Sequence, residues 1–274
     1  MLFQNWLFGN FPKKLGKILL LNLLCFGLFN CGAGSSVETQ IEDKGDLIAE
    51  YQESDRAQYD KIRKVLEKTG TFDALIADVN ENLALPYDIS VIFTTCNEAN
   101  AFYDLENIEI TICYELIQEF LRIFEEDIKT EEDYANEVYH AISFTFFHEL
   151  GHAVIDLYEF PVTGNEEDAA DNFASIMLLD FYADENGVIS GLLQFEQEAI
   201  EEQEDLENLA YWDEHSLSSQ RFYNTACLIY GSDPNGYAFI VEDEYLPEER
   251  AELCEDEYEQ KSNTWWNLLY PYLK

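Results

Sequence analysis

Hydrophobic and polar positions along the chain predict a mostly helical domain with a small β component. After residue 45, apolar residues recur at helical spacing over most of the sequence, and runs rich in β-branched residues are short. Two such runs, 89–95 and 108–112, predict a β-hairpin. This pattern indicates an α+β fold in which helices predominate. Helices are predicted at 46–68, 72–83, 115–124, 134–158, 166–182, 195–207, 216–230 and 247–260, with a short amphipathic end at 265–269.

One predicted helix, 134–158, is apolar on nearly every side and is therefore expected to be buried. It nevertheless contains His148, Glu149 and His152, which form an HExxH motif. Such polar groups are costly inside a protein unless they are paired or bound to a metal. A chance HExxH occurs roughly once in a hundred chains of this length. The buried context, more than the spacing, therefore points to a metal site.

The motif has a specific chemistry. His148 and His152 are four residues apart, share one helix face, and can present two neutral imidazoles to a single Zn²⁺. Glu149 then lies beside the metal, where its carboxylate can take a proton from the attacking water and pass it to a leaving amine. We therefore expect one zinc ion per chain, with Glu149 as the general base.

The third metal ligand is expected in the next predicted helix, which begins with several acidic residues. Glu167 and Asp171 are four residues apart, so one can coordinate the metal while the other accepts the free ring N–H of a ligating histidine. We favour Glu167 as the ligand, with Asp168 as the alternative, and place Asp171 behind the histidine. The helix macrodipole accounts for Glu166. Small alanines in this helix would allow it to approach the first helix closely.

With these residues the chain resembles the gluzincin clan of zinc peptidases, the thermolysin-like group, whose third ligand is the first glutamate of an ExxxD helix. More narrowly, it resembles a bacterial zinc metallopeptidase family that is defined as a domain of unknown function. The resemblance covers approximately residues 85–272. Its matching stretches are CNEANAFY (96–103), ICYEL (112–116), HELGHA (148–153), EEDAAD (166–171), DEHSL (213–217), QRFYN (220–224) and CLIYGSDP (227–234).

The resemblance implies a zincin-like fold, in which a small β-sheet lies over the helix that carries the metal ligands. In zincins an edge strand of that sheet commonly holds an extended substrate by backbone pairing. The strand 108–112, or the neighbouring segment 99–103, is our candidate for this substrate-binding strand.

The resemblance also assigns a role to His215, because thermolysin-like enzymes use a histidine late in the chain to donate a hydrogen bond to the oxyanion. Such a donor contributes about 3 kcal/mol to lowering the barrier. Tyr223 is the reserve candidate for this role. The alternative for His215 is a surface side chain that caps a helix together with Ser216. Arg221 is expected to make a structural ion pair.

Charge and length limit the other functions. The chain has 56 acidic and 15 basic residues and a net charge of −41, which argues against binding nucleic acid or an anionic membrane surface, because phosphates would be repelled. Basic peptides would be attracted. The acidic runs are best explained as solvated helix faces, because no calcium loop of the D-x-D-x-D-G type occurs in the sequence. With 274 residues, one catalytic domain at 46–274 is expected.

The N-terminal segment predicts export. Three lysines precede an apolar run, 18–29, that is short for a membrane span, and the sequence LFNCG then resembles a lipobox with Cys31 as the lipidated residue. We expect a lipoprotein signal peptide at 1–30, a flexible tether at 31–45, and a lipid-anchored protein in the bacterial cell envelope, outside the cytoplasm. A plain secretory signal cut near residue 33 is the alternative, and it would give a secreted or periplasmic protein.

Cysteine usage agrees with export. Beyond residue 31 the chain has four cysteines, and an even number in an exported domain favours two disulfides, for which three connectivities exist. We expect Cys96–Cys113, which brackets the predicted hairpin, and Cys227–Cys254. A second zinc site built from these thiolates is disfavoured, because no CxxC pair occurs.

Two functions from different classes follow. The first is a zinc-dependent endopeptidase that hydrolyses peptides or proteins. The second is a non-catalytic, zinc-containing surface lipoprotein that binds a partner. A purely structural zinc site needs no base and usually has four protein ligands, whereas Glu149 is intact and three ligands are apparent. We therefore expect a metallopeptidase.

Overall fold

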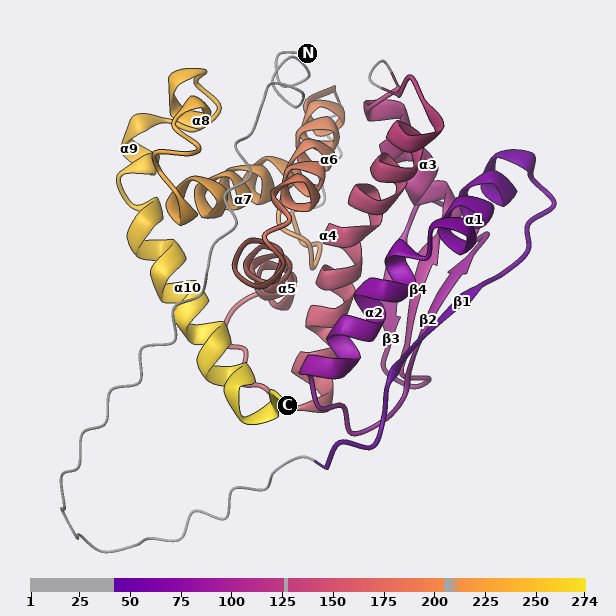
Figure 1. The fold of residues 1–274 in the computed structure, drawn as a ribbon. Helices are drawn as coiled ribbons and strands as arrows, with labels where there is room; N and C mark the ends of the chain where they lie inside the picture. Colours follow the sequence, from indigo (N-terminus) through magenta and orange to yellow (C-terminus); the bar gives the residue numbers. More distant parts are fainter. Residues whose placement is uncertain (1–41, 126–127, 205–208, 210) are drawn as a thin grey trace, which may run out of the picture. The chain divides into compact units, whose positions relative to one another are not determined.

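The computed structural model describes residues 42–125, 128–204, 209 and 211–274. The predicted signal peptide, Cys31 and most of the predicted tether lie outside these residues. Within the described part, the predicted fold class is confirmed, because helices predominate and the strands form one small mixed sheet (Figure 1). No helix in this part is both long enough and apolar enough to cross a lipid bilayer.

The described strands form a four-stranded sheet in the order β1-β2-β4-β3. Strands β1 (Leu47–Tyr51), β2 (Ile89–Thr94) and β4 (Glu109–Cys113) run parallel to one another, and β3 (Ala101–Asp104) is antiparallel to β4. Strands β1 and β3 are therefore the edges of the sheet.

The predicted hairpin between 89–95 and 108–112 is wrong. The two strands are neighbours, but they run parallel, because the chain between them returns through β3 before it turns into β4. The carboxylate of Asp104 accepts hydrogen bonds from the backbone N–H groups of Glu106 and Asn107 and so closes that second turn. The pattern of β-branched residues identifies strands but not their direction. Because β4 is paired on both sides, 108–112 cannot bind a substrate strand, whereas β3 is free to do so.

The predicted helix at 46–68 is wrong in its first part. Residues 47–51 form β1, which pairs with β2, and the helix α1 (Ala57–Thr69) begins only after the polar stretch 52–56. The five residues of β1 have a sequence that suits a strand or the end of a helix equally well. The backbone of a strand some forty residues away decides between them.

A long central helix, α4 (Glu131–Leu157), separates two groups of elements (Figure 1). On one side it contacts α1, α3 (Tyr114–Ile123), β3 and β4. On the other side it contacts α5 (Glu166–Ile176) and α6 (Glu185–Glu204). This position explains why α4 is buried from Val138 to Ile155 almost without interruption.

The remaining helices complete both groups. Helix α2 (Thr71–Asn82) packs on β1, and a π-helical turn, Met177–Tyr182, extends α5. Helix α6 starts ten residues earlier than predicted. Its Gly191 lowers the helical signal, but a Cβ there would lie 2.4 Å from the Phe144 ring, so the contact with α4 requires glycine. The C-terminal part contains α7 (Ser218–Ser232), α8 (Phe239–Glu242), α9 (Glu248–Ala251), α10 (Cys254–Leu269) and a 3₁₀ turn, Tyr270–Tyr272.

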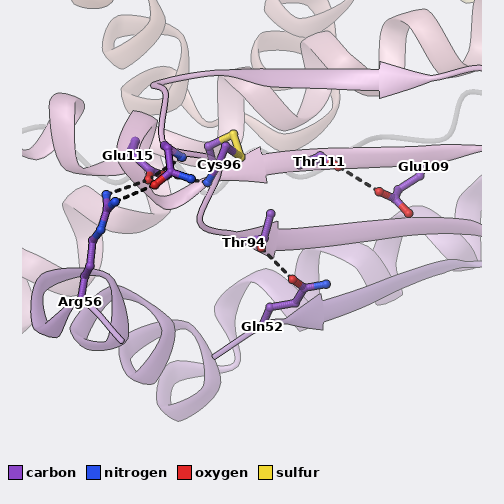
Figure 2. Close-up of a disulfide and its surroundings, with 9 residues drawn as sticks. Gln52, Arg56, Thr94, Cys96, Glu109, Thr111 and Glu115 are labelled. Atoms are coloured by element: carbon purple, nitrogen blue, oxygen red, sulfur yellow. Dashed lines mark hydrogen bonds and ion pairs between the residues drawn. A yellow bond between two sulfur atoms is a disulfide. The ribbon is translucent and has the colours of Figure 1, made fainter. Parts of the chain in front are cut away.

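Both expected disulfides are present, Cys96–Cys113 and Cys227–Cys254. The first joins the chain just after β2 to the end of β4, and Figure 2 shows Glu115 beside it. The carboxylate of Glu115 accepts hydrogen bonds from the N–H of Cys96 at 3.1 Å and from the Arg56 guanidinium at 3.3 Å. The carboxyl end of β2 is thus fixed by a covalent bond and a buried carboxylate together.

Candidate metal centre

Helix α4 brings both histidines of the HExxH motif to one place. It begins with a capping box, in which Thr130 and Asp133 satisfy each other's backbone N–H groups. Four turns later its buried side presents His148 and His152, whose side chains are 8% and 14% exposed. These low exposures mean that the imidazoles need partners, because polar groups out of contact with water are costly.

Helix α5 supplies the carboxylate. The side chain of Asn165 caps the helix by accepting from the N–H of Glu167, so Glu167 lies in the first turn, where the helix dipole stabilises negative charge. The two helices meet closely at Gly151, where a Cβ would come 3.1 Å from the Cα of Ala170. The small residues that the sequence places in both helices therefore bring Glu167 within reach of the histidines.

Three potential ligand groups converge between the helices: the Nε2 atoms of His148 and His152 and the carboxylate of Glu167. The two Nε2 atoms are 3.3 Å apart, and the Glu167 oxygens lie 3.1 Å from that of His148 and 3.4 Å from that of His152. A tetrahedral zinc ion with ligands at about 2.0–2.1 Å separates them by about 3.3–3.4 Å. The donor set and its spacing fit zinc.

The other ring nitrogens are also occupied in a way that fits a metal site. Nδ1 of His148 lies 2.8 Å from Asp171, and Nδ1 of His152 lies 2.9 Å from Glu166. Carboxylates at Nδ1 fix each ring so that Nε2 points inward, which is the usual arrangement behind metal-binding histidines. Arg221 donates to both oxygens of Asp171, at 2.7 and 2.8 Å, and forms the ion pair expected of it.

These contacts shift the ionisation of the centre. Burial lowers the pKa of His148, but hydrogen bonds to Asp171 and Glu167 outweigh it and raise the pKa to about 10. Burial raises the pKa of Asp171, and the adjacent Arg221 guanidinium outweighs this, so the pKa lies well below its usual range. The pKa of Glu167 is lowered as well, by hydrogen bonds from the histidines. The centre therefore combines negative carboxylates with imidazoles that strongly attract a positive charge.

Glu149 and His215 face a pocket of about 180 Å³ beside this centre. Glu149 is 6% exposed, and burial raises the pKa of its carboxyl. His215 lies in the loop before α7, with Nε2 at 3.1 Å from Glu167 and Nδ1 at 3.1 Å from Asp213. Ala99, Asn100 and Ala101, at the start of β3, line the same pocket. The N–H of Cys113 donates to the carbonyl of Asn100 and so extends the β3–β4 ladder.

The two reserve candidates lie elsewhere. Asp168 accepts a hydrogen bond from the hydroxyl of Ser216 at 2.8 Å, so its carboxylate is used to hold the loop that carries His215. The Tyr223 ring meets the Phe222 ring edge to face, and Tyr223 is not among the residues described as lining the pocket. The structure thus groups Glu167 rather than Asp168 with the histidines, and His215 rather than Tyr223 with Glu149.

Glu166 is a residue of the centre that sequence reasoning missed. The helix dipole sufficiently explained an acid at this position, yet the carboxylate bonds to His152. The sequence gives little indication of this role, because Glu166 and Glu167 are neighbours in an acidic run. Their side chains contact different histidine nitrogens only in the folded helix.

Comparison with known families agrees with this geometry. A sequence model of the family described as "Putative metallopeptidase" matches residues 51–269, well over half of the chain. The chain therefore belongs to this metallopeptidase family, and the resemblance to a metallopeptidase family inferred from its motifs is confirmed. No curated protein and no solved structure matches it.

Proposed function

We propose that this protein is a zinc-dependent endopeptidase. One observation carries the proposal: the two Nε2 atoms and the Glu167 carboxylate converge at tetrahedral spacing beside a pocket that contains Glu149. A purely structural zinc site needs no general base, and Glu149 is not among the groups that hold the ligand rings in place. Membership of the metallopeptidase family supports a protein or peptide substrate.

The side chains divide the chemistry between them. A bound zinc ion would polarise the scissile carbonyl and would lower the pKa of water, so that the water becomes a good nucleophile at neutral pH. Glu149 accepts the proton of the attacking water and returns it to the leaving nitrogen. Asp171 keeps the His148 ring oriented, and Arg221 in turn keeps Asp171 ionised and in place.

His215 is suited to stabilise the oxyanion. In the protonated ring, whose pKa is raised by the hydrogen bond to Glu167, Nδ1 donates to Asp213 and Nε2 faces the centre, where it can donate a hydrogen bond to a developing negative charge. The substrate backbone would pair with β3, because β3 is an edge strand and its first residue, Ala101, lines the pocket. An extended peptide held in this way passes between β3 and the two histidines of α4.

We also propose that the chain is exported and anchored by lipid at Cys31 in the bacterial cell envelope. The lysine-flanked apolar run before Cys31 and the two disulfides support this location, because disulfides persist in oxidising compartments. The peptidase domain would then act at the membrane surface without inserting into it.

A substitution at Glu149 tests the proposed chemistry. We expect Glu149→Gln to retain one zinc per chain and to lose cleavage of an unfolded protein substrate by about 10²–10⁴-fold, because the general base is removed and the ligands are spared. Glu132→Gln, an exposed position on the same helix, is the matched control and should cleave normally. Full turnover in Glu149→Gln would place the activity elsewhere, and a reconstituted protein without zinc would refute the metal assignment.

A further inference from the structure

The pocket beside the metal centre adjoins a second hollow. The first, of about 180 Å³, includes the start of β3, the HExxH turn of α4 and part of α6. The second, of about 340 Å³, lies between α3 and α6. Both are lined by Leu116, Gln194 and Glu198, so the two hollows adjoin along these residues.

Part of the wall of the first hollow is apolar. Phe144, one turn before His148 on α4, meets Phe195 of α6 edge to face with ring centroids 5.7 Å apart, and Leu116 of α3 lines the same space. Apolar walls of this kind suit the methylene stem of a long side chain, whose polar end continues beyond them.

The charge at the far end of these walls is negative. Glu198 is held in place by hydrogen bonds from Gln194 at 2.7 Å and from Ser218 at 3.1 Å. A carboxylate has about four acceptor positions, so Glu198 keeps room for a further donor. Among the residues that the structure describes, no lysine or arginine nitrogen forms an ion pair with Glu198 within 4.0 Å.

Arg221 lines the same hollow but forms no hydrogen bond to Glu198 within the described part of the chain. Its guanidinium is bonded to both oxygens of Asp171 and lies over the Phe195 ring at 4.1 Å. Its positive charge is thus paired with the carboxylate of Asp171. The second hollow adds Glu119 and Glu201 against a single Arg122, so the negative field increases along it.

Resting on the proposed peptidase function, we infer that this pocket binds a lysine or arginine side chain of the substrate next to the scissile bond, with Glu198 as its charged partner. The aromatic walls hold the stem and the carboxylate receives the cationic end. The substrate class is therefore basic peptides or basic segments of proteins. Glu198 is a specificity-determining residue in this assignment and takes no part in bond cleavage.

Binding of short hydroxamates tests the inference without relying on catalysis. A hydroxamate fixes one end of the compound at zinc, and its adjacent side chain is lysine, norleucine or glutamate, of similar length but different charge. With the zinc-loaded full chain, we expect the lysine compound to bind at least tenfold more tightly than the norleucine compound, and the glutamate compound to bind most weakly. The preference should persist at high salt, because a contact inside a pocket is screened less than long-range attraction.

Two variants separate Glu198 from the general acidity of the protein. Glu198→Gln keeps the size of the side chain: its amide oxygen can accept from Gln194, and its NH₂ group can donate to the hydroxyl oxygen of Ser218. It should reduce the lysine preference to below threefold while norleucine binding changes little. Glu196→Gln, the same substitution on the same helix outside both hollows, should leave the preference intact. Unfolding temperatures of both variants check that the fold is retained.

The outcomes distinguish the two proposals. Equal binding of the lysine and norleucine compounds, or an unchanged preference in Glu198→Gln, overturns the pocket assignment, even if peptides are cleaved. Cleavage products mapped by mass spectrometry from a mixed peptide pool give an independent readout, in which lysine or arginine should occur at one position flanking the cleaved bond. A clear lysine preference in binding combined with no cleavage of any peptide would instead refute the peptidase function. Binding of neither compound overturns the inference together with the metal centre.

Discussion

Asp171 connects the metal centre to the protein interior, because it bonds both to His148 and to the buried Arg221. Its side chain is 8% exposed, and it accepts a hydrogen bond from His148 and two from Arg221, whose own side chain is 12% exposed. In Asp171→Asn the shape is kept but the charge is lost. One amide oxygen then remains for donors that previously shared two carboxylate oxygens, and the new NH₂ group faces one of them.

The size of the effect follows from these contacts. Removing one partner of a buried ion pair costs about 3–5 kcal/mol, because the other charge is left unpaired. Loss of a carboxylate behind a metal-binding histidine costs about 10–100-fold in metal affinity. We therefore expect Asp171→Asn to lower both the unfolding free energy of the metal-free protein and its affinity for zinc. The two losses are separable, because the first arises at Arg221 and the second at His148.

Two measurements check this prediction: denaturant unfolding of the metal-free full chain and competition for zinc with a chelator of known affinity. Asp168→Asn is the matched control, since it removes the same charge from the same helix but contacts Ser216 instead. The control should keep zinc affinity within a few-fold of the original protein. If Asp171→Asn matched the control in both measurements, the role given to the Asp171 carboxylate would be wrong.

Three further predictions concern other parts of the molecule. His215→Ala should leave zinc content unchanged and lower kcat by about 10²–10³-fold, as steady-state kinetics would reveal, because an oxyanion donor is lost; an unchanged kcat would exclude that role. Replacement of Cys96 and Cys113 by serine should lower the unfolding free energy by about 3 kcal/mol on the loop-entropy model and weaken peptide cleavage while zinc stays bound, whereas unchanged stability in denaturant would contradict the reasoning. Mass spectrometry of the mature N-terminus should find lipid on Cys31, and Cys31→Ala should give uncleaved or released protein; an unmodified terminus beyond that position would indicate ordinary secretion.

Local spacing was sufficient to predict the part of the centre that lies on single helices. His148 and His152 share a face because of the helical repeat alone, and the same holds for Glu167 and Asp171. The pairing of Cys96 with Cys113 was also accessible, because both follow segments rich in β-branched residues. In each case the residues lie either four positions apart on one helix or directly after a recognisable strand.

Contacts between distant elements could not be predicted in the same way. The direction of β2 relative to β4 depends on a return strand of only four residues, and β1 becomes a strand only by pairing with β2. Glu198 belongs to a helix whose acidic residues resemble a solvated surface, and it faces the pocket because α6 packs on α4. Such positions depend on the three-dimensional arrangement of helices, which the pattern along one helix does not contain.

The close contact of Gly151 with Ala170 has a consequence for how this centre tolerates change. Two ligands come from α4 and the third from α5, so the distance between these helices determines how far the third ligand atom lies from the other two. A methyl group added at Gly151 would contact Ala170 and Phe173, neither of which is a ligand. By pushing the two helices apart, it would nevertheless move Glu167 away from both histidines. Metal bond lengths tolerate only about 0.2 Å of deviation. A substitution at Gly151, a residue without a side chain, is therefore expected to weaken metal binding as directly as a change of a ligand would.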